Sequence, residues 1–396
     1  MSEFKTYTLD QLCIVGSSKR VHLSDYVEQG IPFYRSKEVI ELSSGKNISE
    51  QLFISSEKYS EIKSKFPVPQ ENDVLITAVG TIGEILVVKD PNFYFKDGNL
   101  IWLRNINFEI IDIDYLYYFL KSDLFQKTIK YNNIGAVQKA LTIDFLKTVK
   151  ITLPSLDNQR KLISVLKSID KKLKTNNQIN QELEAMAKTL YDYWFVQFDF
   201  PDQNGKPYKS SGGKMVYHPE LKREIPEGWG VEKLKYFLTI KNGKDHKHLQ
   251  NGKFAVYGSG GIMRAVTEYL HSGESILFPR KGTLNNVMYV NEKFWTVDTM
   301  FYSEVNKNNS ALYVFYSVKD IDFNKLNTGT GVPSMTSSIL YDLNIIVPEE
   351  NILEKFNTIV KQNYETIKLN SIQNQELTQL RDWLLPMLMN GQVKVE

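Results

Sequence analysis

The stretch LPSLDNQRKLISVLKSIDKKLKTNNQINQELEAMAKTLYDYWFVQFDF, residues 153–200, decides the architecture of this chain. Pro154 ends a predicted strand, and Ser155 or Asp157 can cap the helix that follows. Apolar or seam side chains then recur at alternating spacings of four and three residues, which is a heptad pattern. These positions are Leu162, Leu166, Ile169, Leu173, Asn176, Asn180, Leu183, Ala187, Leu190 and Trp194. The pattern predicts one helix over roughly residues 155–198, about 65 Å long at about 1.5 Å per residue.

The same helix occurs a second time in the chain. Residues 141–190 align with residues 335–384 at a constant offset of 194, and 13 of these 50 positions are identical. The second seam is less apolar than the first, because it contains Asn363 and Arg381. A repeat of about half the chain indicates a duplicated unit rather than a short-repeat solenoid. The second seam consists of Phe356, Val360, Asn363, Ile367, Asn370, Asn374, Leu377, Arg381, Leu384 and Leu388.

Each copy begins with a β-rich part. Residues 74–88, VLITAVGTIGEILVV, predict a strand, a Gly turn and a second strand, because β-branched residues flank the glycines. Residues 274–290, ESILFPRKGTLNNVMYV, repeat this plan, and short helices such as residues 114–129 are interspersed. Between the copies, residues 199–230 contain nine Gly or Pro and have no helical period, which predicts a linker.

These patterns predict an α+β fold with two α/β globular domains and two long helices. A long helix cannot bury its seam alone, so we expect the two helices to pack as an antiparallel coiled coil about a pseudo-twofold axis. Antiparallel pairing would bring four asparagines together, where buried Asn fixes register; solvated polar positions are the alternative. These asparagines are Asn176, Asn180, Asn370 and Asn374. The predicted order is a first domain (1–152), a helical region (153–200), a linker (201–230), a second domain (231–346) and a second helical region (347–396).

The composition excludes several classes of protein. The chain has 396 residues, of which 42% are hydrophobic and 24% charged, and these values are typical of folded proteins. Its single cysteine, Cys13, excludes an internal disulfide framework and a multi-Cys zinc site, so a reducing, cytoplasmic location is expected. No apolar run approaches the roughly 18 residues of a membrane span, and residues 1–10 lack the apolar core of a signal peptide.

The sequence contains no motif that indicates catalysis. It has no Walker-type phosphate loop and no Asn-Pro-Pro-Tyr-like methyltransferase motif. His246 and His248 could ligate a metal, but their Lys-rich setting without nearby Cys or Glu favours a solvated basic loop. The formal net charge is only +2, with −1 over residues 1–150 and +4 over residues 201–346. This is not the strongly basic composition of a stand-alone nucleic-acid binder. We expect no metal site and no catalysis by this chain.

Residues 153–200 closely resemble the central conserved region of specificity subunits of type I restriction–modification systems. SSGGKMVYHPELKREIPEGW, residues 210–229, resembles the segment that leads into the second target-recognition domain of these subunits. The resemblance covers nearly the whole chain, and the duplicated order agrees with it. The loop motifs that resemble target-recognition domains are FYRSKEV (33–39), GAVQKALT (135–142), YGSGGI (257–262), FWTVDTMFY (294–302) and GTGVPSMT (329–336).

This resemblance implies a DNA specificity subunit with no activity of its own. Each target-recognition domain would read one half of a bipartite, asymmetric site in double-stranded DNA. The helices would set the spacer and dock two methylation subunits, which carry S-adenosylmethionine. Two restriction subunits, which use ATP and Mg, would join through the methylation complex, so this chain would hold no cofactor itself.

Two other functions are open to the same sequence. A fused nuclease or methyltransferase of the same defence class would need carboxylate or cofactor motifs that the sequence lacks. A structural coiled-coil adaptor without sequence-specific DNA binding would explain the helices. It would not explain two globular domains with Arg- and Lys-bearing Gly turns.

Candidate DNA contacts are the Arg, Lys, Asn, Gln, Ser and Thr residues near Gly turns, because their directional donors can read base edges. Arg280 is the leading base-reading candidate, with a solvated turn as the alternative, and the lysines of residues 233–253 are expected to contact phosphates. Gln138, Lys139 and Ser334 either contact DNA or cap the joint between domain and helix. The full set is Arg35, Ser36, Lys37, Thr81, Gln138, Lys139, Lys241, Lys244, Lys247, Ser259, Arg280, Lys281, Thr283, Asn285, Asn286 and Ser334.

Overall fold

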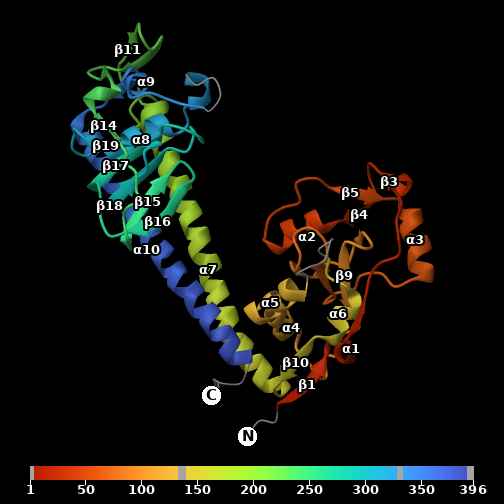
Figure 1. The fold of residues 1–396 in the computed structure, drawn as a ribbon. Helices are drawn as coiled ribbons and strands as arrows, with labels where there is room; N and C mark the ends of the chain where they lie inside the picture. The colour runs from red at the N-terminus through yellow and green to blue at the C-terminus, as the bar shows by residue number, and fades with distance from the viewer. Residues whose placement is uncertain (1–3, 133–139, 328–332, 390–396) are drawn as a thin grey trace. The chain divides into compact units, whose positions relative to one another are not determined.

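The chain forms two folded units in a computed structural model (Figure 1), which describes residues 4–132, 140–327 and 333–389. Unit 1 combines residues 1–175 with residues 372–396, and unit 2 comprises residues 176–371. Two long helices, α7 (Leu156–Tyr191) and α10 (Glu350–Met389), each contribute residues to both units. Within the described residues, no helix is both long and apolar enough to cross a membrane.

Unit 1 is built on a four-stranded sheet in which the strand order is β2-β9-β6-β7. A smaller sheet with the order β3-β5-β4-β8 lies in the same unit, and β1 pairs antiparallel with β10, so the start and end of the domain meet. The strands are β1 (Lys5–Thr8), β2 (Ile14–Gly16), β3 (Tyr26–Val27), β4 (Ile31–Tyr34), β5 (Leu52–Ile54), β6 (Val74–Thr77), β7 (Ile85–Val87), β8 (Tyr94–Phe95), β9 (Leu100–Arg104) and β10 (Lys150–Leu153). The helices are α1 (Leu9–Leu12), α2 (Ser36–Ser43), α3 (Ser56–Lys65), α4 (Ile113–Lys121), α5 (Asp123–Asn132) and α6 (Ile143–Thr148).

Unit 2 contains a six-stranded sheet in which the strand order is β14-β19-β17-β18-β15-β16. Strand β13 pairs antiparallel with β20 and again joins the start of the domain to its end. The strands are β11 (Met215–His218), β12 (Arg223–Pro226), β13 (Gly230–Lys233), β14 (Leu238–Asn242), β15 (Asn251–Gly258), β16 (Gly261–Val266), β17 (His271–Pro279), β18 (Met288–Thr296), β19 (Met300–Val305) and β20 (Asn344–Val347). The helices are α8 (Ala311–Lys319) and α9 (Ser337–Tyr341).

The strand order confirms the predicted duplication. The order β14-β19-β17-β18 in unit 2 repeats β2-β9-β6-β7 in unit 1, and the pair β13–β20 repeats the pair β1–β10. The two predicted strand–turn–strand segments form the hairpins β6–β7 and β17–β18. Gly80 and Gly282, in their turns, have φ values of 77° and 88°, a region that favours glycine. Unit 2 differs by adding β15 and β16 to its main sheet.

The segment between the two copies is folded rather than extended. Its composition predicts a linker, but it forms the hairpin β11–β12 and buries Phe200, Ile225 and Trp229 in the core of unit 2. The rings of Phe200 and Trp229 stack with their centroids 4.8 Å apart. Gly and Pro here shape tight turns around aromatic anchors, and turn composition alone could not distinguish this from a flexible connection.

The predicted heptad seams are confirmed. Every seam position whose side chain the structure describes is buried or half-buried, from Leu162 to Trp194 on α7 and from Phe356 to Leu384 on α10. Helix α7 ends at Tyr191, and a π-helical turn over Asp192–Val196 follows it within the predicted range.

The two helices pack antiparallel, as predicted. In unit 2, Asn370 Nδ2 donates to Asn180 Oδ1 at 2.9 Å. In unit 1, Arg381 on α10 lies 3.2 Å from the Asp170 carboxylate on α7. Later residues of α10 therefore meet earlier residues of α7, which defines an antiparallel pair. The ion pair also explains how the seam accommodates Arg381, which departs from the apolar pattern.

Each globular domain is fastened to a long helix within its own unit. In unit 1, the Tyr118 hydroxyl on α4 donates to Asp170, and the fully buried amide of Gln159 on α7 donates to the carbonyl of Ile110 at 2.9 Å. In unit 2, the Tyr364 hydroxyl on α10 donates to the carbonyl of Tyr289 on β18 at 2.6 Å. Domain and helix are thus one packed body in each unit.

Candidate nucleic-acid interface

The Gly turn between β17 and β18 is held against the loop that precedes α9. The Arg280 backbone N–H donates to the Thr299 carbonyl at 2.8 Å, and the Arg280 carbonyl accepts from the Met335 N–H at 2.9 Å. Lys281 forms an isolated β-bridge with Ser334, which is 53 residues further along the chain. The structure therefore brings together three sequence-predicted residues, with the Arg280 and Lys281 side chains exposed on a backbone fixed from both sides.

A hollow of about 230 Å³ lies beside this turn. The Arg280 guanidinium lies 5.8 Å from the centre of the Phe301 ring at its wall, so an aromatic face orients the cation. Sequence reasoning missed Asn242, Phe301 and Thr336, although Asn242 directly follows the predicted Lys241. The residues lining the hollow are Asn242, Arg280, Lys281, Phe301, Ser334, Met335, Thr336 and Ser337.

The asparagines of this turn form hydrogen bonds within unit 2. Asn286 Nδ2 donates to the Ser259 carbonyl at 2.8 Å, and Asn285 Nδ2 donates to Asp322 at 3.1 Å. A Cβ on Gly282 would lie 2.9 Å from Ser259 Oγ, so the loop after β15 approaches the turn closely. Both amides hold the turn in place, while Thr283 is exposed beside them.

The three predicted phosphate-contacting lysines lie on β14 and the segment after it. Lys241 forms an ion pair with Glu304 at 3.4 Å on the neighbouring strand β19. Lys244 and Lys247 are exposed, and the Lys244 backbone is fixed because its N–H donates to the Thr296 carbonyl at 2.9 Å. Lys244 and Lys247 are therefore presented to solvent at one end of the unit 2 sheet.

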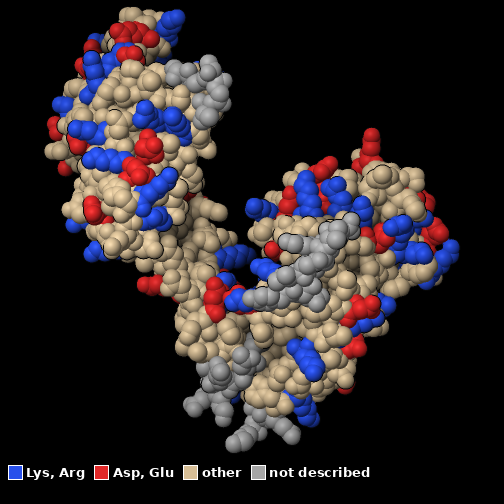
Figure 2. Space-filling view, in the orientation of Figure 1, with Lys and Arg blue, Asp and Glu red and all other residues tan. Residues whose placement is uncertain are grey.

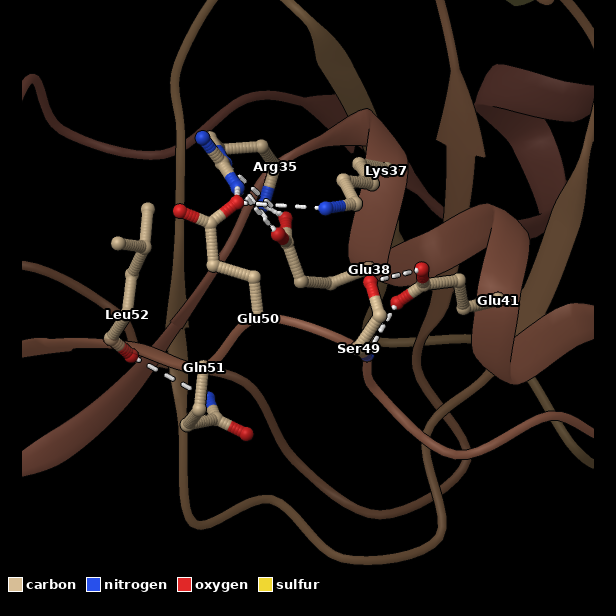
Figure 3. Close-up of polar contacts among 8 residues, drawn as sticks. All are labelled: Arg35, Lys37, Glu38, Glu41, Ser49, Glu50, Gln51 and Leu52. Atoms are coloured by element: carbon tan, nitrogen blue, oxygen red, sulfur yellow. Dashed lines mark hydrogen bonds and ion pairs between the residues drawn. The ribbon is translucent and has the colours of Figure 1, made fainter. Parts of the chain in front are cut away.

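In unit 1 the predicted residues Arg35, Ser36 and Lys37 lie at the start of α2. Figure 3 shows Arg35 and Lys37 with their carboxylate partners. Arg35 Nη2 lies 2.6 Å from Glu38, which is fully buried, and a hydrogen bond to Glu38 raises the pKa of Arg35. Lys37 Nζ lies 3.2 Å from Glu50. The hydrogen bond from Lys37 lowers the pKa of Glu50 most, and the hydrogen bond from Arg35 lowers it further. The guanidinium is thus anchored by a buried carboxylate rather than projecting freely.

The first turn of α2 lies next to the β6–β7 turn. The Asn99 carbonyl accepts from Ser36 Oγ at 3.3 Å and from the Ala78 N–H at 2.8 Å. Thr81 is exposed in this turn, and its carbonyl accepts from Thr77 Oγ1 at 2.6 Å. Two sequence-predicted segments of the first domain therefore form one surface.

The two units join their Gly turn to the following loop in the same way. Val79 forms an isolated bridge with Ala140 in unit 1, as Lys281 does with Ser334 in unit 2. The predicted contacts Gln138 and Lys139 lie outside the residues that the structure describes. The equivalence nevertheless places one loop cluster in each unit at the same point of the repeated fold.

The charges around these clusters are mixed. On the face seen in Figure 2, lysines and arginines of each unit are interspersed with acidic side chains rather than gathered into one basic patch. Among the residues that the structure describes, no group of three His, Cys, Asp or Glu side chains could hold a metal ion. What the clusters offer is hydrogen-bond donors and cations on rigid turns, the chemistry that contacts phosphates and base edges.

Comparison with known proteins identifies the family. The sequence model of the family described as the type I restriction modification DNA specificity domain matches residues 1–185 and 226–379. The chain belongs to this family. Both copies of the repeat are matched, so the resemblance seen in the sequence is confirmed over nearly the whole chain.

Two curated relatives and one solved structure show how far the similarity extends. The MjaIX specificity subunit of Methanocaldococcus jannaschii is 28% identical, and the alignment covers 96% of this chain and 91% of that protein. A putative type I specificity subunit of Haemophilus influenzae is 31% identical over 48% of this chain and 46% of its own length. A crystal structure of an S subunit from M. genitalium has a TM-score of 0.63 at 18% identity and covers 98% of this chain and 96% of that one, which shows a shared fold.

Proposed function

We propose that this chain is the non-catalytic DNA-specificity subunit of a type I restriction–modification complex. Each unit reads one half of a bipartite DNA site, and the paired helices set the spacer between the halves. The observation that carries this proposal is the repeated strand order, which places a polar Gly-turn cluster at the same point of each unit. Because the loops of the two clusters differ in sequence, the half-sites differ and the whole site is asymmetric.

Within unit 2 the residues divide between reading and positioning. Arg280 is exposed on a turn whose backbone is fixed by Thr299 and Met335, so its guanidinium can donate two bonds to one guanine. Lys244 and Lys247 contact phosphates, which position the duplex without specifying its sequence. Asn286 holds the turn through Ser259 and supports Arg280 rather than reading DNA itself.

Two methylation subunits dock on the long helices. Both helices carry large apolar side chains that face away from the seam: Met186 on α7 is 59% exposed, and Leu369 and Trp383 on α10 are 67% and 57% exposed. A contiguous patch of exposed apolar side chains indicates a protein interface, and we infer that these residues belong to the surface on which the methylation subunits dock. S-adenosylmethionine would lie in the methylation subunits, and ATP and Mg in two restriction subunits that join through them. The complex would act in the cytoplasm, where its DNA lies.

The decisive test is sequencing of adenine methylation in cells that express this chain with its methylation subunit. A bipartite methylated motif that disappears on deletion of this gene supports the proposal and names both half-sites. Arg280→Ala should change or erase preference in one half-site only, and Lys214→Ala, an exposed lysine paired with Glu227, serves as the control. An assembled complex that methylates no motif would instead support a coiled-coil adaptor.

A further inference from the structure

Two cations on the first turn of α2 share one exposed carboxylate. Glu50 lies 3.4 Å from Arg35 Nη2 and 3.2 Å from Lys37 Nζ, and its side chain is 60% exposed (Figure 3). Glu38 differs sharply, because it is fully buried and lies 2.6 Å from Arg35. Glu38 is therefore the fixed structural partner of Arg35, whereas Glu50 occupies a position that is open to solvent.

Glu50 is held at the cations by its neighbour rather than by its own ion pairs alone. The Ser49 N–H and Oγ donate to the two carboxylate oxygens of Glu41 at 3.0 and 2.6 Å, and Glu41 lies on the same helix α2. The loop between α2 and β5 is thus tied back to the helix one residue before Glu50. This tether keeps the carboxylate near Arg35 and Lys37 even when it is displaced from them.

We propose that Arg35 and Lys37 form a binding site for a phosphate of the DNA backbone, and that Glu50 occupies this site in the free protein. The proposal deepens and rests on the proposed function. Carboxylate and phosphate oxygens accept charge-assisted bonds from the same donors. Exposed ion pairs are weak, so a phosphate can displace Glu50, whereas the buried Glu38 stays in place. The pair Arg35–Lys37 then positions the backbone instead of reading bases.

The surroundings suit a DNA backbone at this point. The Asn99 carbonyl links Ser36 to Ala78, so the site adjoins the β6–β7 turn with the exposed Thr81. An internal competitor for a phosphate site weakens sequence-independent binding, which consists mostly of phosphate contacts. Glu50 thereby limits the time that the first domain spends on DNA lacking its half-site.

The test compares Glu50→Gln with Glu61→Gln in the full chain bound to its methylation subunit. Glu61 is a matched control in unit 1, because it also pairs with two cations, here Lys58 and Lys65, and is similarly exposed at 53%. Fluorescence anisotropy measures affinity for a labelled duplex of mixed sequence. E50Q should bind about 2- to 5-fold more tightly, the size expected for loss of an exposed ion pair, and E61Q should match the wild type.

A second variant identifies the site. Lys37→Gln should weaken binding and flatten its salt dependence by about one counterion. Adding E50Q to K37Q should give less than half of the gain that it gives alone, since one of the two released cations is missing. Arg35 is left unchanged, because its loss would strand the buried Glu38 carboxylate and destabilise the domain.

The outcomes separate this proposal from the function on which it rests. If the wild type binds the duplex but E50Q matches E61Q, or its gain is the same with and without Lys37, the Glu50 site is wrong and the proposed function stands. If E50Q weakens binding only to DNA carrying the methylated motif, Glu50 reads a base and the proposal is also wrong. If neither wild type nor variants bind any duplex, both proposals fall.

Discussion

Asp170 is the most informative single residue for the coupling between domain and helix. Its carboxylate on α7 accepts from the Tyr118 hydroxyl on α4 and pairs with Arg381 on α10 at 3.2 Å. All three residues belong to unit 1. Asp170→Ala removes both interactions, whereas Asp170→Asn keeps an acceptor for Tyr118 and removes only the charge. We expect the first substitution to loosen α4 from both helices and the second to do so less.

The expected magnitude follows from exposure. Tyr118 is 6% exposed, so loss of the acceptor for its hydroxyl costs about 1–3 kcal/mol. The side chains of Arg381 and Asp170 are 31% and 36% exposed, so solvent screens their ion pair to about 0.5–1 kcal/mol. Asp170→Ala should therefore lower the free energy of local opening by about 2–3 kcal/mol, and Asp170→Asn by about 1 kcal/mol.

Amide hydrogen exchange measured by mass spectrometry reports the free energy of local opening for each segment of the chain. It avoids the assumption that a chain with two units unfolds in one step. Protection of the α4 amides, residues 113–121, should fall at least 30-fold in Asp170→Ala, the factor for roughly 2 kcal/mol. Asp123→Asn is the matched control in the next helix, because Asp123 is 80% exposed and pairs only at the surface with Lys127. Its α4 protection should equal that of the wild type.

A double-mutant cycle isolates the ion pair. Arg381→Met keeps an aliphatic stem in the seam, and its combination with Asp170→Asn should give a coupling of about 0.5–1 kcal/mol that shrinks with added salt. A coupling within error of zero would refute the seam ion pair. Unchanged α4 protection in Asp170→Ala would refute the role of the Tyr118–Asp170 hydrogen bond in fastening α4 to α7.

The other expectations concern separate parts of the chain. Burial raises the pKa of Cys13 to about 12, so the thiol should resist iodoacetamide at pH 8 until the protein is unfolded. Gln159→Leu leaves the carbonyls of Ile110 and Pro154 and the Asp112 N–H without their partner and should cost about 3 kcal/mol in thermal melts. Gln159→Glu should cost at least as much, because it keeps the acceptor for Asp112 but sets a buried carboxylate against the two carbonyls. Replacing both Asn180 and Asn370 with Leu should permit a second helix register, detectable by cysteine cross-linking; a single unchanged register would disprove a register role for that pair.

The architecture could be predicted because it is periodic. A heptad seam predicts which face of a helix is buried. The duplication at a constant offset predicts that the second copy of the helix covers this face. The same reasoning failed at residues 199–230, where Gly and Pro dominate the composition. What decides that segment is the long-range packing of Phe200 and Trp229, which carries no local signal.

The sequence predicted which kinds of residue lie at the Gly turns, but not what each side chain does there. Arg280 and Lys281 beside a Gly turn follow from the sequence, whereas their proximity to Ser334 is found only in the structure. The sequence could not show that the amide of Asn286 is committed to Ser259, or that Arg35 is anchored on the buried Glu38. Such roles depend on partners that are brought close only by the fold.

The divergence of the two repeats explains why α7 pairs with α10. At the offset of 194, Asp170 corresponds to Tyr364 and Ala187 to Arg381. Unit 1 thus joins its two helices by an ion pair, while unit 2 places Ala187 and Tyr364 together in an apolar core. Pairing α7 with another α7 would set Asp170 against Ala187, and pairing α10 with another α10 would set Arg381 against Tyr364. Either arrangement leaves a charge in the seam without its partner, so the substitutions that broke the symmetry favour the pairing within one chain.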